Sequence, residues 1–123
     1  MTDSDVTLDE LKDEIGEFCG ERDWDQFHDA KELAVALSIE ASELLEHFRY
    51  MDEDQVAATM DDPDQREDVK DELADVFYHL LRIAQFYDID LADAFHRKLA
   101  KTAEKYPVEK AKGSRKKYTE FDD

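Results

Sequence analysis

Residues 33–48 of this chain, L-A-V-A-L-S-I-E-A-S-E-L-L-E-H-F, limit its fold more than any other stretch. Leu37 and Leu44 lie two turns apart on one helix face, and nearly every other side of the helix is apolar or small. Such a helix is normally buried. Glu40 nevertheless lies on the same stripe, between the two leucines, and Glu43 follows one turn later. The stretch therefore predicts a buried helix that carries two carboxylates.

A second pair of acids, Glu72 and Asp75, has the same three-residue spacing in a similarly apolar setting. The apolar stripe beside it is formed by Val69, Leu73, Val76, Leu80, Ile83 and Tyr87. The spacing alone means little in a chain with 34 acids among 123 residues, so the signal is the apolar surroundings. Buried carboxylates are costly unless they shift their pKa, find a partner or hold a metal. We therefore expect two helices to place four carboxylates around one metal site.

The donor atoms restrict which metal this site would hold. Carboxylate oxygens suit Mg²⁺, Mn²⁺ or Ca²⁺, and Mg²⁺ commonly shares its ligands with substrate phosphates. Zinc prefers histidine or cysteine, and Cys19 is the single cysteine. A di-iron site needs a histidine three residues after an acid, whereas His47 and His79 follow Glu43 and Asp75 by four. The alternative to a metal is a buried salt-bridge network, for which the available cations are Arg49, Arg66, Lys70 and Arg82.

Composition favours an all-α fold, because the chain has only three glycines, two prolines and little β-branched patterning. We expect a single domain over residues 1–123, ending in a basic tail at 107–123. The single cysteine excludes an intramolecular disulfide, and its place on the apolar face of the first helix indicates packing. No apolar segment follows a basic N-terminus, so we expect neither a signal peptide nor a membrane span and predict a cytoplasmic protein.

Helix starts are marked by capping signals at Thr7, Asp29, Asp62-Pro63 and Asp90. The predicted helices cover about residues 7–20, 29–49, 63–87 and 90–106, and residues 51–62 are a polar connection with room for one short helical stretch. Together they predict a four-helix bundle. Acids interrupt the stripes of its second and third helices, so we expect oligomerisation to complete the core.

The formal net charge of −18 disfavours binding of DNA or RNA. An acidic surface can attract a basic partner, or it can keep a protein soluble in a salt-rich cytosol, where the Debye length is only about 3 Å at ~1 M. We favour salt adaptation, because the acids are spread over all helices. Residues 97–123 are different: they hold nine of the sixteen basic residues, which could face anionic phosphate or neutralise their neighbours.

The segment 21–28 contains the only tryptophan, Trp24, together with Phe27 and His28. Two aromatic rings and a histidine within five loop residues can form a pocket for a flat ligand. Alternatively, Trp24 and Phe27 pin the loop to the core. Local sequence alone favours this second interpretation.

Four motifs together resemble one family. They are E-R-D-W-D-Q-F-H-x-x-K at 21–31, S-I-E-A-S-E-L-L-E at 38–46, D-E-L-A-D-V at 71–76 and K-Y-P-V-E-K-A-K-G-S-x-K-K-Y at 105–118. In this order and spacing they resemble the MazG-like nucleotide pyrophosphohydrolases, most closely the small dCTP pyrophosphatase branch, over nearly the whole chain. The resemblance implies an oligomeric (dimeric or tetrameric) all-α enzyme. It would use Mg²⁺, or Mn²⁺ as a substitute, to hydrolyse a nucleoside triphosphate to the monophosphate and pyrophosphate.

The resemblance also assigns roles to residues. The metal ligands would be Glu40, Glu43, Glu72 and Asp75, with Glu40 or Glu43 as catalytic base. Substrate would be bound by Trp24, His28, Lys31, Tyr50 and His79, and by basic residues among Lys98, Lys101, Lys110 and Lys117. Tyr50 replaces a usual tryptophan, His79 a usual tyrosine and Thr102 a common asparagine, which leaves base and sugar preference open. A non-catalytic acidic helical module that binds a basic partner remains the alternative function.

Overall fold

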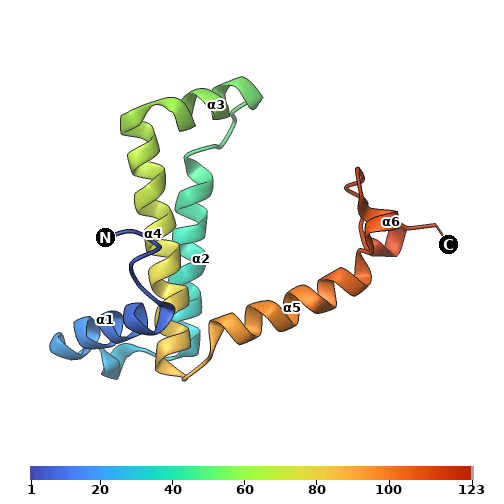
Figure 1. Cartoon of the computed structure of the whole chain (residues 1–123). Helices are drawn as coiled ribbons and strands as arrows, with labels where there is room; N and C mark the ends of the chain where they lie inside the picture. The colour runs from blue at the N-terminus through green and yellow to red at the C-terminus, as the bar shows by residue number, and fades with distance from the viewer. Residues whose placement is uncertain (123) are drawn as a thin grey trace. The chain divides into compact units, whose positions relative to one another are not determined.

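The computed structural model describes residues 1–122, which contain helices and no strand (Figure 1). In chain order the elements are α1 (Leu8–Glu21), the 3-10 turn η1 (Asp25–Phe27), α2 (Ala30–Glu46), α3 (Glu53–Asp61), α4 (Pro63–Phe86), α5 (Leu91–Lys105), α6 (Val108–Ala111) and η2 (Tyr118–Glu120). The predicted all-α class is confirmed. The chain forms two compact units, Met1–Ile89 and a second from Asp90 onward.

The predicted helix starts are confirmed by their capping hydrogen bonds. Thr7, Asp29, Asp62 and Asp90 each accept the backbone N–H of the residue three positions later. The connection at 51–62 is more ordered than expected, because α3 fills most of it. Asp52 and Gln55 cap α3 reciprocally, each side chain bonding the other's backbone N–H.

Helix α4 is the centre of the first unit, and α1, α2 and α3 all pack against it. Its antiparallel neighbour α2 lies alongside it for most of its length (Figure 1). The apolar side chains buried between these helices are Ile15, Cys19, Leu33, Val69, Leu81 and Ala84. Cys19 is fully buried, as predicted. The antiparallel pairing brings the acids in the middle of α2 opposite those in the middle of α4.

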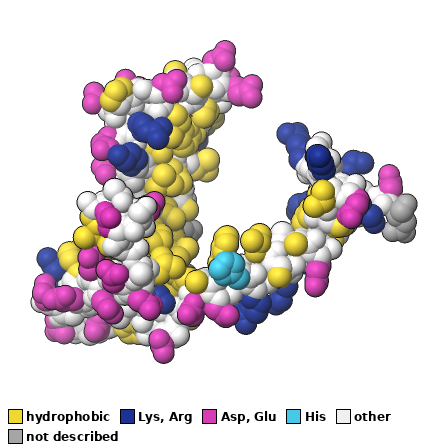
Figure 2. Space-filling view, in the orientation of Figure 1, with side chains coloured by type: hydrophobic (Ala, Val, Ile, Leu, Met, Phe, Trp, Pro, Cys, Tyr) yellow, Lys and Arg dark blue, Asp and Glu magenta, His cyan; other side chains and the backbone are white. Residues whose placement is uncertain are grey.

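The prediction that α2 is buried on all sides is wrong for the single chain. Leu33 is the one buried residue of this helix, whereas Val35, Ile39 and Leu45 are 49%, 54% and 65% exposed. Hydrophobic side chains accordingly gather along α2 on the molecular surface (Figure 2). The reason is geometric: in the first unit α2 packs mainly on α4, and one neighbour can cover only one face of a helix.

The second unit consists of α5, α6 and η2. Tyr106, at the end of α5, packs edge-to-face on Tyr118 and Phe121, so the basic tail folds back on that helix end. Phe95 and Leu99, one turn apart on α5, are 63% and 53% exposed. None of the helices within residues 1–122 combines the length and apolar character that a bilayer-spanning segment needs.

Candidate metal centre

Three of the four predicted metal ligands converge. Glu40, Glu43 and Glu72 each offer a carboxylate oxygen, and these oxygens all lie within 4.8 Å of one another. Glu40 and Glu43 occupy successive turns of α2, and Glu72 reaches them from α4. The carboxylate of Asp75, one turn further along α4, is not part of this group. We call these three glutamates the carboxylate cluster.

The charges of the carboxylate cluster perturb one another. The pKa of Glu40 is raised, chiefly by a side-chain hydrogen bond with Glu43, then by burial and by the negative charges of Glu43, Asp75 and Glu72. The charge of Asp75 thus acts on the cluster although its oxygens lie outside the 4.8 Å group.

The protein itself leaves part of the cluster unpaired. Glu40 Oε2 and Glu72 Oε2 are buried and have no hydrogen-bond partner within the described chain. Two buried acceptors without donors are a clear departure from the usual satisfaction of polar groups. An all-oxygen donor set of this kind suits a hard divalent cation such as Mg²⁺ or Mn²⁺. The residues present therefore fit a metal.

The alternative of a buried salt-bridge network does not hold. In the described part of the chain, the one ion pair that reaches the four acids joins His47 Nε2 and Glu72 Oε1, 3.6 Å apart. The arginines and lysine considered as partners are engaged elsewhere: Arg49 with Glu46, Lys70 with Glu67, Arg82 with Asp25, and Arg66 with the Met60 carbonyl. Sequence reasoning missed His47 at the cluster; its position four residues after Glu43, on the same helix face, was the available signal.

The loop between α1 and α2, residues 22–29, carries the aromatic side chains and is called the aromatic loop below. Phe27 is 66% exposed and Trp24 is 38% exposed, so the interpretation that both pin the loop to the core is wrong. The Trp24 ring touches Phe18 edge-on, with centroids 5.7 Å apart, and its centroid lies 6.5 Å from that of His28. The exposed parts of these rings are accessible to a ligand.

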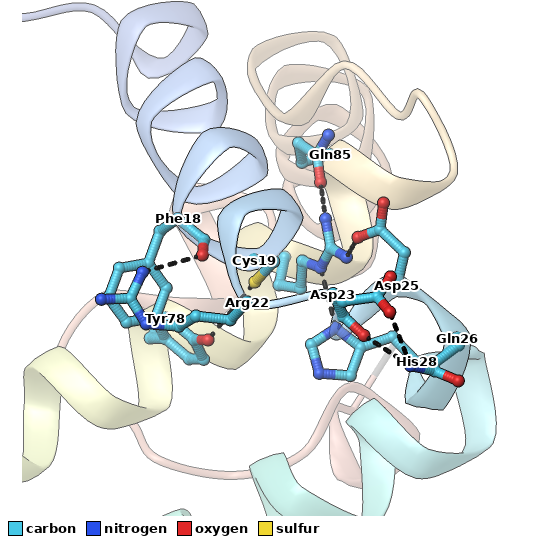
Figure 3. A network of polar contacts seen from close by, with 10 residues as sticks. Phe18, Cys19, Arg22, Asp23, Asp25, Gln26, His28, Tyr78 and Gln85 are labelled. Carbon is cyan, nitrogen blue, oxygen red and sulfur yellow. Dashed lines mark hydrogen bonds and ion pairs between the residues drawn. The ribbon is translucent and has the colours of Figure 1, made fainter.

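Polar contacts to α4 hold the aromatic loop instead. Figure 3 shows Asp25, His28 and Gln85 converging on one guanidinium, that of Arg82. Arg82 Nε donates to His28 Nδ1 at 3.0 Å, Nη2 pairs with the Asp25 carboxylate, and Nη1 donates to the Gln85 side-chain oxygen. Sequence reasoning considered Arg82 only as a partner for the metal-site acids.

The His28–Arg82 hydrogen bond predicts a pH dependence of stability. Burial and the adjacent Arg82 charge, with a smaller effect from His79, lower the pKa of His28 below its ordinary 6.5, although Asp25 opposes this. A lowered folded-state pKa means that His28 contributes stability above pH 6.5, and that this stability is lost as the pH falls towards the folded-state pKa. We expect His28→Gln, whose side-chain oxygen accepts from Arg82 without titrating, to remove this component.

The measurement is chemical denaturation of both proteins across the pH range below 7. The chain's many carboxylates titrate in both proteins alike. The difference between the two unfolding free energies at each pH therefore isolates the contribution of His28. Identical pH profiles for the wild type and His28→Gln would contradict the prediction.

The other predicted substrate-binding residues lie in four places. Tyr50, beyond the end of α2, is 87% exposed, has a positive φ of 63° and accepts a hydrogen bond from Arg49 at 2.6 Å. His79 Nδ1 lies 2.8 Å from the Asp75 carbonyl oxygen. Lys31 is exposed in the first turn of α2. The exposed lysines of the second unit are Lys98, Lys101, Lys110 and Lys117. Their roles stay predictions.

Comparison with known proteins identifies relatives over most of the chain. The model of the MazG-like family matches residues 35–121. The dCTP pyrophosphatase 1 of Bos taurus is 33% identical over 118 residues, which cover 96% of this chain and 70% of the bovine protein. Its Mus musculus counterpart is 34% identical over 115 residues, covering 94% and 68%. A crystal structure of a pyrophosphatase from Archaeoglobus fulgidus matches with a TM-score of 0.76 and 36% identity, covering 81% of this chain and 92% of that one.

Proposed function

Because the chain belongs to the MazG-like family, we propose that it is a nucleotide pyrophosphohydrolase that uses Mg²⁺, or Mn²⁺ in its place. Water would cleave the anhydride between the α- and β-phosphates of a nucleoside triphosphate, giving the monophosphate and pyrophosphate. The observation that carries the proposal is the pair of buried, unpartnered oxygens in the carboxylate cluster, on Glu40 and Glu72. They support a site built to hold a cation beside a polyphosphate rather than an acidic surface.

The proposed mechanism assigns the cluster two tasks. Glu40, Glu43 and Glu72, with Asp75 beside them, would hold the divalent ion, which supplies charge stabilisation for the phosphates. Either Glu40 or Glu43 would accept the proton of the attacking water. The geometry supports this, because carboxylate oxygens of both residues lie within 4.8 Å of each other and of Glu72, so either would lie beside the attacking water. The leaving pyrophosphate would take its electron pair with the bridging oxygen.

The aromatic loop is proposed to bind the base. Trp24 and His28 offer partly exposed rings on the same loop, and Tyr50 offers another at the end of α2. Flat nucleobases stack well on such faces. Since the similar bovine and mouse proteins are named dCTP pyrophosphatases, deoxypyrimidine triphosphates, including non-standard ones, are the first substrates to test. Lys31 and the lysines of the second unit would neutralise phosphate charge. We further infer a cytoplasmic, salt-adapted homo-oligomer.

Product identification tests the reaction. Incubation of the protein with dCTP and Mg²⁺ should release the monophosphate and pyrophosphate in equal amounts, with no release when the metal is chelated. Orthophosphate with the diphosphate would contradict the proposed bond cleavage. If no nucleotide in a panel is hydrolysed with either Mg²⁺ or Mn²⁺, the acidic module that binds a basic partner becomes the better explanation.

A further inference from the structure

Arg82 is an unusual residue for the interior of this protein. Its exposed fraction is 1%, and it is the one buried charged residue among those that the structure describes. A buried guanidinium is costly unless its donors are satisfied and its charge is paired. Apolar residues of similar size often stabilise a core as well or better. The position of Arg82 therefore calls for an explanation other than stability.

The partners of Arg82 come mainly from the aromatic loop. Its planar guanidinium reaches the Asp25 carboxylate and the His28 ring with different nitrogens, and Gln85 accepts from a third. The same group lies over the Phe86 ring, 4.9 Å from the centroid. A rigid fork of donors with several fixed acceptors has little freedom to turn. Arg82 thus holds two separate residues of the loop in one geometry.

The aromatic loop has few other attachments in its middle. Its start is fixed by the Trp24 N–H, which donates to the Cys19 carbonyl at 3.0 Å. Just beyond its end, the Ala30 N–H donates to the Tyr87 hydroxyl of α4 at 2.7 Å. Just before Trp24, Asp23 adopts a positive φ of 56°, which is uncommon for a residue other than glycine. The side-chain hydrogen bonds from the loop to α4 are those of Asp25 and His28 with Arg82.

The helix that carries Arg82 also carries half of the predicted metal ligands. Asp75 precedes Arg82 by seven residues, about two turns, and Glu72 by ten, on one uninterrupted helix. A contact between Arg82 and the loop therefore relates Trp24 and His28 to the carboxylate cluster through a single rigid element.

We propose that Arg82 is a positioning residue: it clamps the aromatic loop to α4 and so sets where the nucleotide base lies relative to the phosphates at the carboxylate cluster. The catalytic part of this inference rests on the proposed function. The clamp itself does not, since it follows from the contacts of Arg82. Loss of the clamp should weaken capture of the base more than the chemical step, because Arg82 touches none of the cluster glutamates.

The test replaces Arg82 by methionine, which fills similar space without donors. Trp24 is the only tryptophan, so its fluorescence reports on the loop directly. In Arg82→Met its emission should shift to longer wavelength and become easier to quench with acrylamide, while helical circular dichroism is unchanged. The KM for dCTP should rise roughly tenfold with kcat nearly constant, since small misplacements of a binding group have effects of this order or larger.

Arg66→Met is the matched control, because Arg66 lies on the same helix but bonds the Met60 carbonyl, away from the loop. It should leave both the Trp24 emission and the KM unchanged. Arg82→Lys keeps the charge but cannot bridge Asp25 and His28 as a fork, so it should resemble Arg82→Met.

Asp25→Asn decides the question if Arg82→Met does not fold, because the Asp25 side chain is 60% exposed and its replacement is tolerable. As in Arg82→Met, the Trp24 emission should shift to longer wavelength and the KM should rise. Unchanged Trp24 emission in the folded variant overturns the proposal, and so does a fall in kcat with an unaltered KM. If the wild type hydrolyses no nucleotide, the proposed function fails, and the fluorescence still decides whether Arg82 holds the loop.

Discussion

Glu40→Gln should reduce pyrophosphate release by roughly three orders of magnitude, the scale typical for loss of a group that acts on the transition state. The substitution keeps the shape of the side chain and removes one carboxylate from a cluster whose oxygens lie within 4.8 Å of one another. It removes a proposed metal ligand and one of the two proposed bases at once. Product formation, followed as released pyrophosphate under saturating Mg²⁺, measures the loss.

The same variant should be at least as stable as the wild type when no metal is present. Carboxylate oxygens of Glu40, Glu43 and Glu72 lie within 4.8 Å of one another, so their negative charges repel, and an amide removes part of that repulsion. Added Mg²⁺ should raise the melting temperature of the wild type, because a ligand that binds only the folded state stabilises it. The rise should be much smaller for Glu40→Gln.

Glu46→Gln is the matched control, since Glu46 lies on α2 but its side chain is 61% exposed and pairs with Arg49. It should retain activity and the full response to Mg²⁺. If Glu40→Gln keeps wild-type turnover, Glu40 is not part of the site. If it is inactive but melts at a much lower temperature without metal, a structural role explains the loss.

The second large effect concerns assembly. We expect the protein to sediment with a mass at least twice that of the 14.4 kDa chain. The reason is the apolar surface left open in the single chain, on α2 by Val35 and Ile39 and on α4 by Leu73 and Phe77. Full burial of each such side chain contributes about 1.5–3 kcal/mol. High-salt buffer should favour association, because it screens the repulsion between copies that each carry a formal charge of −18.

Val35→Lys should weaken this association by tenfold or more, an order typical of a charge placed in an apolar contact. Ala57→Lys makes the same change in charge on the exposed surface of α3 and serves as the control. Analytical ultracentrifugation over a range of concentrations gives both dissociation constants. A wild-type monomer at micromolar concentration, or equal effects of the two substitutions, would contradict the prediction.

Much of the local structure could be read from short spacings. The capping residues Thr7, Asp29, Asp62 and Asp90 act within three residues of themselves, so the sequence around each is enough to place a helix start. The acid pairs on α2 and α4 were visible for the same reason, because the helical repeat puts residues three apart on neighbouring turns. The capping box of α3 is equally local. Residues 51–62 were nevertheless predicted as a polar connection, because they lack a strong apolar stripe.

Contacts between distant segments could not be derived in this way. The pairing of Arg82 with Asp25 and His28 spans more than fifty residues and exists only because α1, the loop and α4 pack together. His47 meets Glu72 only because α2 and α4 are antiparallel at one particular register. Sequence pattern also could not show that Phe27 faces solvent, since an aromatic residue in a loop suits a core anchor and an open face equally.

The sequence by itself determined the helical class, the helix starts and the presence of two acid pairs in apolar surroundings, because each depends on interactions within a turn or two of the chain. The tertiary structure decided that Glu40, Glu43 and Glu72 meet, that two of their oxygens are left without a donor, and that Arg82 serves the loop rather than the acids. These outcomes depend on which helix faces pack together. That packing depends on the burial and pairing of side chains throughout the first unit, and so on residues far apart in the sequence.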